Sequence, residues 1–179
     1  MSRKLIVTIH LYLAAFFTPV LLITAISGGL YLLGIKGNQE SQVIYQGPSD
    51  TFNIQAEDIN SQVNDFLTQN QLTQDYDYLL KRGNRIITRP TSKEYLVFQV
   101  KEQDLTVTRH TPDFVLKIVE LHKGHGPSMF KTLQKFMALG IIFILLSGFY
   151  LGISSPKLRT NTLVISSTGT LLFLALVLF

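Results

Sequence analysis

Three long apolar runs stand out along this chain, and polar stretches separate them. The first extends from Leu5 to Leu33, and at about 1.5 Å per helical residue it exceeds the ~30 Å hydrocarbon layer of a membrane. The others extend from about Phe136 to Ile153 and from about Thr162 to Phe179, near the minimum length for crossing. The pattern predicts three transmembrane helices.

A cleaved signal peptide is the alternative for the first run. Ala25-Ile26-Ser27 has the small-x-small pattern that a signal peptidase recognises. The apolar run before it is longer than a usual signal-peptide core. We therefore expect the first run to be kept as a membrane anchor.

The polar region between the first two runs has the periodicity of a small folded domain. Helical spacing from Ala56 to Leu67 predicts one helix, and the residues from Gly47 to Asp50 are typical of a turn. A second helix is expected from about Asp113 to Leu121. About four short strands are predicted near residues 76–80, 85–89, 94–100 and 105–108. The predicted fold is therefore a membrane α-helical protein with a small extracytoplasmic α+β insert.

This reading divides the chain into five segments. They are an N-terminal transmembrane helix (1–35), an α+β domain (36–112), a helix with a His/Gly connector (113–130), a second transmembrane helix (131–155), and a cytoplasmic loop with the third transmembrane helix (156–179).

The distribution of charge predicts the orientation. The chain has sixteen Lys and Arg, twelve Asp and Glu, and a net charge of +4. All acidic residues lie in the insert, whereas Arg3, Lys4, Lys157 and Arg159 flank the apolar runs with no acid beside them. The positive-inside rule places these four in the cytoplasm, so residues from about 36 to 131 and the C-terminus lie outside. The basic pI of about 9.3 is thus a topology signal and does not indicate a nucleic-acid partner.

Composition and motifs exclude most enzymatic chemistry. The chain has no cysteine, which excludes disulfides, thiolate metal sites, iron–sulfur clusters and thiol catalysis. Phosphate-binding loops, the H-E-x-x-H motif and the G-x-S-x-G motif are all missing from the sequence. We expect no enzyme by itself and at most an electron-transfer subunit of a reductase. The four histidines remain as candidates for chemistry.

His10 lies inside the first apolar run, where an imidazole is costly unless it has a partner. Helical spacing places small and flat side chains on its face, among them Ala14, Phe17 and Gly28, which would admit a planar macrocycle. Haem ligation is one interpretation. A hydrogen bond to a neighbouring helix, or contact with the lipid headgroups, is the other.

His122 and His125 form His-Lys-Gly-His before the second apolar run. Either imidazole is a candidate axial ligand of a haem at the outer face of the membrane. A zinc or iron site made by His122, His125 and Glu120 is a weaker candidate. His110 follows a strand-like segment, and we expect it to have a packing role.

Two pairs of motifs carry a family resemblance. Leu121-His122-Lys123-Gly124-His125-Gly126, followed by Leu146-Ser147-Gly148-Phe149-Tyr150-Leu151, resembles the signature of the PepSY-associated transmembrane family. Ile9-His10-Leu11, followed by Ile26-Ser27-Gly28-Gly29-Leu30, is similar to the opening span of that family. The resemblance covers the chain up to about residue 158, and the insert is similar to a PepSY module.

The resemblance implies a multi-pass protein of the bacterial inner membrane that holds b-type haem. His10 and His122, with His125 as competitor, would then be axial ligands. The third span begins Thr160-Asn161-Thr162, without the histidine of larger members. Since His10 and His122 belong to opposite faces of a ~30 Å layer, they cannot share one haem.

We therefore expect electron transfer through haem b, supporting the reduction of ferric iron, a siderophore or an extracytoplasmic flavoprotein. The second axial ligand would come from a homodimer or a redox partner subunit. The alternative is a haem-free, membrane-anchored module that docks a periplasmic protein, peptide or peptidase.

Overall fold

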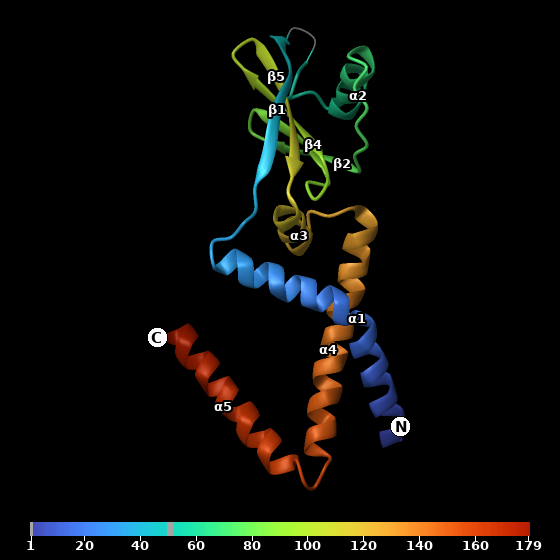
Figure 1. Cartoon of the computed structure of the whole chain (residues 1–179), viewed down its shortest axis with the longest axis vertical. Helices are drawn as coiled ribbons and strands as arrows, with labels where there is room; N and C mark the ends of the chain where they lie inside the picture. The colour runs from blue at the N-terminus through green and yellow to red at the C-terminus, as the bar shows by residue number, and fades with distance from the viewer. Residues whose placement is uncertain (1, 50–51) are drawn as a thin grey trace. The chain divides into compact units, whose positions relative to one another are not determined.

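The computed structural model describes residues 2–49 and 52–179. The chain forms two compact units, Met1–Val20 with Lys135–Phe179, and Leu21–Gln134. Among the described residues, three helices are long and apolar enough to cross a membrane: α1 (Arg3–Leu32), α4 (Ser128–Ile153) and α5 (Arg159–Leu178) (Figure 1). These helices confirm the three predicted spans and support a multi-pass membrane protein.

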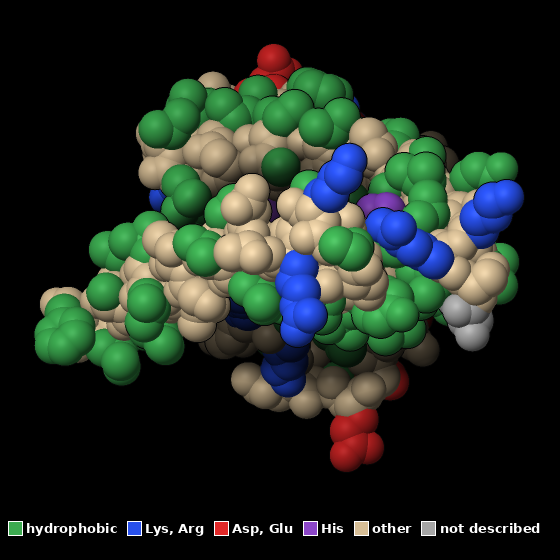
Figure 2. Space-filling model, turned by 90° about the horizontal axis from the view of Figure 1, so that it is seen from below, with side chains coloured by type: hydrophobic (Ala, Val, Ile, Leu, Met, Phe, Trp, Pro, Cys, Tyr) green, Lys and Arg blue, Asp and Glu red, His purple; other side chains and the backbone are tan. Residues whose placement is uncertain are grey.

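The surfaces of the long helices are apolar. α5 has no buried residue, and many large hydrophobic side chains of α1 and α4 are exposed. Hydrophobic side chains accordingly occupy much of the surface seen in Figure 2. Helix α4 begins at Ser128, before the predicted apolar run from Phe136, because a helix can continue through polar residues beyond the hydrocarbon layer. Exposed apolar surface of this size is expected where side chains face the acyl chains of lipid.

In the first unit, small residues allow close contact between helices. Phe17 of α1 is buried, and a Cβ added to Gly140 of α4 would collide with its ring. A Cβ on Gly152 would lie 2.7 Å from the Oγ1 of Thr162, at the start of α5. Close approach at small residues is the usual basis of helix association in membranes.

The second unit contains a five-stranded antiparallel sheet in the order β1-β5-β4-β3-β2. The strands are β1 (Gln39–Pro48), β2 (Tyr78–Arg82), β3 (Arg85–Arg89), β4 (Tyr95–Lys101) and β5 (Asp104–Pro112). Four of them confirm the predicted strands.

Strand β1 was not among the predicted strands, and the turn predicted from Gly47 to Asp50 is wrong at its start. Gly47 and Pro48 end β1, whereas Asp50 lies outside the described residues. Residues of β1 are mostly exposed, because it is an edge strand, and this removes the apolar alternation that marks a half-buried strand. Its antiparallel pairing with β5 places it in the sheet (Figure 1).

Helix α2 (Ile59–Gln69) supplies the other half of the core. Val63 and Leu67 of this helix are buried with alternate residues of β3, β4 and β5. Aromatic rings fill the centre, with Phe52 stacked on Phe98 at 5.3 Å and Phe66 edge-on to Phe98 at 5.4 Å. The buried core is Phe52, Ile54, Val63, Leu67, Ile86, Leu96, Phe98, Leu105 and Val107.

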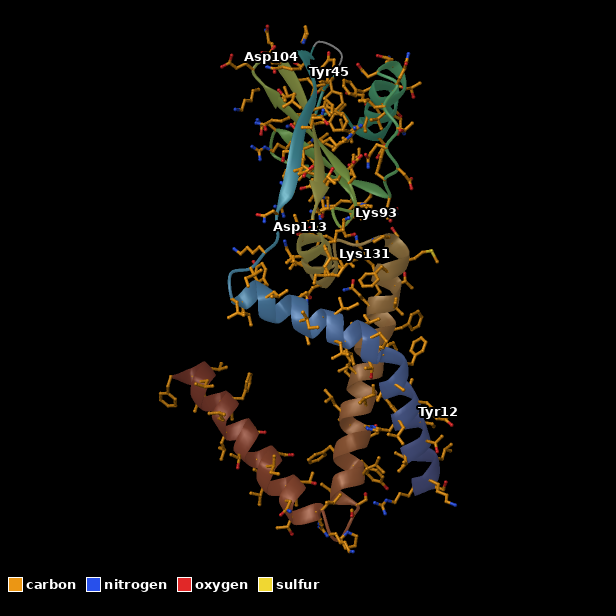
Figure 3. The ribbon with its side chains drawn as sticks, in the orientation of Figure 1. Tyr12, Tyr45, Lys93, Asp104, Asp113 and Lys131 are labelled. Carbon is orange, nitrogen blue, oxygen red and sulfur yellow. The ribbon has the colours of Figure 1, made fainter. Side chains whose placement is uncertain are left out.

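Helix α3 (Phe114–His122) begins directly after β5. The carboxylate of Asp113 accepts from the backbone N–H of Leu116 at 2.7 Å, as an N-cap, and from that of Asn38 at 2.8 Å. These hydrogen bonds lower the pKa of Asp113 and tie the start of α3 to the segment before β1. Figure 3 labels Asp113 at this junction. The sheet thus fixes the position of α3. It thereby also fixes His122, the last residue of that helix.

Candidate functional site

His10, on α1, is hydrogen-bonded to a serine of α4. Its Nδ1 lies 2.9 Å from the Oγ of Ser147, and that hydroxyl donates to the carbonyl oxygen of Ile144 at 3.1 Å. A hydroxyl has only one proton to donate, so Ser147 accepts from His10. Nδ1 of His10 is therefore the donor, and in that tautomer the lone pair lies on Nε2.

His122, the last residue of α3, makes the corresponding contacts with α1. Its Nδ1 lies 2.9 Å from the carbonyl oxygen of Thr24 and 3.3 Å from the Oγ of Ser27. The Ser27 hydroxyl itself donates to the Thr24 carbonyl at 3.0 Å. A carbonyl only accepts, so Nδ1 of His122 must be the protonated nitrogen. The lone pair again lies on Nε2.

The two histidines thus contact equivalent Ser-Gly pairs. A Cβ added to Gly148 would lie 3.2 Å from Cε1 of His10, and a Cβ added to Gly28 would lie 3.1 Å from Cε1 of His122. Glycine therefore makes room for each ring, and the preceding serine, buried in both cases, lies against its Nδ1. Within the part of the chain that the structure describes, Nε2 of neither ring has a hydrogen-bond partner.

A pocket lies beside His122. Its volume is about 440 Å³, which is within the usual range of ligand pockets. The walls are mainly apolar and come from α1, α3 and the residue after α3: Ser27, Gly28, Tyr31, Leu32, Val119, His122 and Lys123. A mainly apolar pocket with an imidazole in its wall suits a large, flat, mostly apolar ligand.

His125 does not join His122 but binds Glu120. The buried Glu120 carboxylate accepts from Thr91 at 2.5 Å, from Lys123 at 2.7 Å and from His125 Nδ1 at 2.7 Å. Burial raises the pKa of Glu120, but these hydrogen bonds outweigh it, and the pKa lies below its ordinary value. Burial lowers the pKa of His125 despite the attraction to Glu120.

The weaker candidate, a metal site of His122, His125 and Glu120, is not assembled. The His122 ring contacts α1, whereas the His125 ring contacts Glu120. Throughout residues 2–49 and 52–179, no group of three or more His, Asp or Glu is placed to hold a metal ion. The physical reason is that the backbone turns after His122, with Gly124 at φ +75°, so the two imidazoles separate.

His110 has a packing role, as predicted. Its ring stacks on Tyr95 at 5.0 Å, and its Nδ1 lies 2.8 Å from the Oγ of Ser41. Burial lowers its pKa. His110 contacts neither Ser-Gly pair, so its substitution is a matched control for substitutions of His10 and His122.

Sequence reasoning named the histidines but not their partners. Both partners lie in recognisable sequence motifs, because Ser27-Gly28 and Ser147-Gly148 belong to the segments that resemble the PepSY-associated family. The sequence does not indicate which Ser-Gly dipeptide contacts which histidine. Comparisons with models of protein families, with curated proteins and with solved structures give no match to this chain.

Proposed function

We propose that this chain is a small membrane subunit that carries electrons across the bilayer through b-type haem. One observation carries the proposal: His10 and His122 both have Nδ1 engaged as a donor and Nε2 free. A metal-bound imidazole typically donates its other N–H to a carbonyl or a similar acceptor, which fixes the tautomer and raises the basicity of the ligand. Both rings have this arrangement, and the apolar pocket beside His122 suits a macrocycle.

His10 and His122 would each supply one axial imidazole. Bound haem would contribute a one-electron couple whose potential depends on its axial ligands. The Ser147 hydroxyl would hold His10 in the ligating tautomer, and the Thr24 carbonyl would do so for His122. His125, whose Nδ1 binds a carboxylate, is the competing ligand near the end of α3.

A second copy of this chain or a partner subunit would complete the coordination. His10 is the only histidine in the sequence of its unit, so a second imidazole for that haem must come from outside the unit. The orientation follows the positive-inside rule, with the N-terminus in the cytoplasm and the sheet outside. Resemblance to the PepSY-associated family supports the bacterial inner membrane, and ferric compounds or an extracytoplasmic flavoprotein as acceptors.

An absorption spectrum tests the proposal. The full chain, made in haem-replete cells and purified in detergent, should show Soret and α bands in the reduced-minus-oxidised difference spectrum. Pyridine haemochrome measurement then gives haem per chain. His10→Ala and His122→Ala should each lose haem, whereas His110→Ala, which removes a packed imidazole, should keep the full amount. Absence of both bands, or equal haem in all four proteins, would contradict the proposal.

A second candidate function is a haem-free, membrane-anchored module that docks a periplasmic protein. The observation in its favour is that Nδ1 of each imidazole already makes a hydrogen bond between helices. Such a bond is enough to stabilise a polar side chain in a membrane. Co-purification of a crosslinked partner that persists in a doubly substituted protein, His10→Ala with His122→Ala, would favour this function. Loss of that partner on haem depletion would favour the first.

A further inference from the structure

The sheet has one covered face and one open face. Residues of a strand alternate between faces, and in β3 Ile86 and Thr88 are buried against the core, so Arg85, Ile87 and Arg89 belong to the opposite face. Helix α2 packs on the core side. The open face ends at α3 and the residues that follow it.

A polar pocket of about 580 Å³ occupies this open face. It has four Lys or Arg side chains against the single carboxylate of Glu120, and uncharged polar and apolar residues complete the walls. The lining residues are Gln39, Arg82, Arg85, Ile87, Arg89, Thr91, Tyr95, Val97, Gln99, Thr108, His110, Leu116, Glu120, Lys123 and His125. All belong to the unit Leu21–Gln134.

The single acid in the pocket pairs with Lys123 and cannot also balance the three arginines. Glu120 already accepts from Thr91, Lys123 and His125. Its distance to the nearest guanidinium nitrogen, Nη1 of Arg89, is 3.7 Å, beyond hydrogen-bond range. Arg82 and Arg85 form no ion pair with any described residue.

Arg89 has donors that the protein leaves unfilled. Its side chain is 6% exposed, its Nη1 donates to the Oγ1 of Thr91 at 2.8 Å, and its buried Nε has no acceptor among the described residues. Buried polar groups are nearly always hydrogen-bonded, so an exception requires an explanation. A guanidinium that lines a pocket and has spare donors is suited to a carboxylate or phosphate, whose oxygens match its geometry.

We infer that this pocket binds a small anion with two or more carboxylate or phosphate groups. Arg85 and Arg89 project from the same face of β3 and would each contact one anionic group, while Lys123 contributes from the end of α3. The volume suits a small organic molecule, and Ile87, Val97 and Tyr95 provide apolar contact for its carbon skeleton. The inference does not depend on haem, because no residue of the pocket is a proposed axial ligand except the competitor His125.

Calorimetric titration of the full chain in detergent tests the inference. Citrate is the carboxylate probe and inorganic pyrophosphate the phosphate probe, both in about 0.15 M salt to screen distant charges. Arg85→Gln removes one cation whose side chain is exposed and has no described partner, so the fold should persist. We expect it to weaken binding about tenfold, the loss of one charge-assisted hydrogen bond.

Lys81→Gln is the matched control. It removes the same charge from the same sheet, but Lys81 does not line the pocket, and its effect should stay below about twofold. Preference for citrate identifies a carboxylate ligand, and preference for pyrophosphate identifies a phosphorylated one; either supports the inference. Lack of binding by both probes at millimolar concentration, or equal weakening by the two substitutions, would overturn it.

Discussion

The Nδ1 of His10 and the Oγ of Ser147 lie 2.9 Å apart and join α1 to α4. His122 and Ser27 repeat this relationship at 3.3 Å, with the Thr24 carbonyl as a further acceptor. In both pairs the serine hydroxyl donates a hydrogen bond to a carbonyl oxygen one turn earlier in its helix. The histidine is consequently a donor at Nδ1, whatever binds Nε2.

Ser147→Ala should destabilise the contact between α1 and α4. The substitution leaves the Nδ1–H of His10 without an acceptor in an apolar environment, at a cost of about 1 kcal/mol. Equilibrium unfolding of the full chain in detergent measures this. Ser166→Ala, at an exposed position of α5, is the matched control and should change little. Equal effects of the two substitutions would show that the Ser147 hydroxyl has no stabilising role.

Gly28→Ala and Gly29→Ala should differ although the glycines are neighbours. A Cβ on Gly28 would lie 3.1 Å from Cε1 of His122, whereas a Cβ on Gly29 has nothing within 4 Å. The His122 ring must move in the first variant, which weakens its bond to Thr24. We expect Gly28→Ala to be less stable than Gly29→Ala by about 1 kcal/mol. Nitrogen NMR of the imidazole checks the cause, and an unchanged Nδ1 signal in Gly28→Ala would refute it.

Glu120→Gln should be strongly destabilising. The buried Glu120 carboxylate accepts hydrogen bonds from Thr91, Lys123 and His125. It is also the carboxylate 3.7 Å from Arg89, so its neutralisation removes the negative charge nearest to that buried guanidinium. Breaking a buried pair in this way costs about 3 kcal/mol. Glu94→Gln is the control, because its pair with Arg109 is 3.4 Å long and its two side chains are 45% and 30% exposed, so the pair is worth less than about 1 kcal/mol. Chemical unfolding of both variants compares them directly, and similar losses would mean that burial of Glu120 is unimportant.

The unit Leu21–Gln134, which contains the sheet, should become less stable in acid. Protonation of Asp77 should account for part of this loss. Hydrogen bonds from the Oγ and N–H of Ser128, at 2.7 and 2.6 Å, lower the pKa of Asp77 from its ordinary value of 3.8. A lowered carboxyl pKa gives stability that is complete above the unfolded pKa and is lost as the pH falls through the folded pKa. Asp77→Asn should therefore flatten the pH dependence of unfolding below about pH 5.

Asp75→Asn provides the control for this acid dependence. The Asp75 carboxylate accepts no hydrogen bond from the residues that the structure describes, so its removal should leave the slope of stability against pH unchanged. A slope that stays the same in Asp77→Asn would show that Ser128 does not hold the carboxylate in solution.

The sequence by itself determined the three membrane helices, four of the five strands and the identity of the candidate histidines. These features are local. An apolar run long enough to cross a membrane, or an alternation within a strand, is recorded in neighbouring residues and needs no distant partner. The edge strand Gln39–Pro48 escaped detection for the same reason, because its exposed residues carry no alternation and only pairing with β5 orders it.

The tertiary structure alone decided what each histidine contacts. Ser147 is 137 residues from His10 in the sequence, and Ser27 is 95 residues from His122. No spacing rule connects positions so far apart. The same holds for the open basic face of the sheet, where Arg89 and Glu120 come from separate elements. Residue types determine which chemistry is available, but packing between helices and strands determines which donor meets which acceptor and which donor remains free.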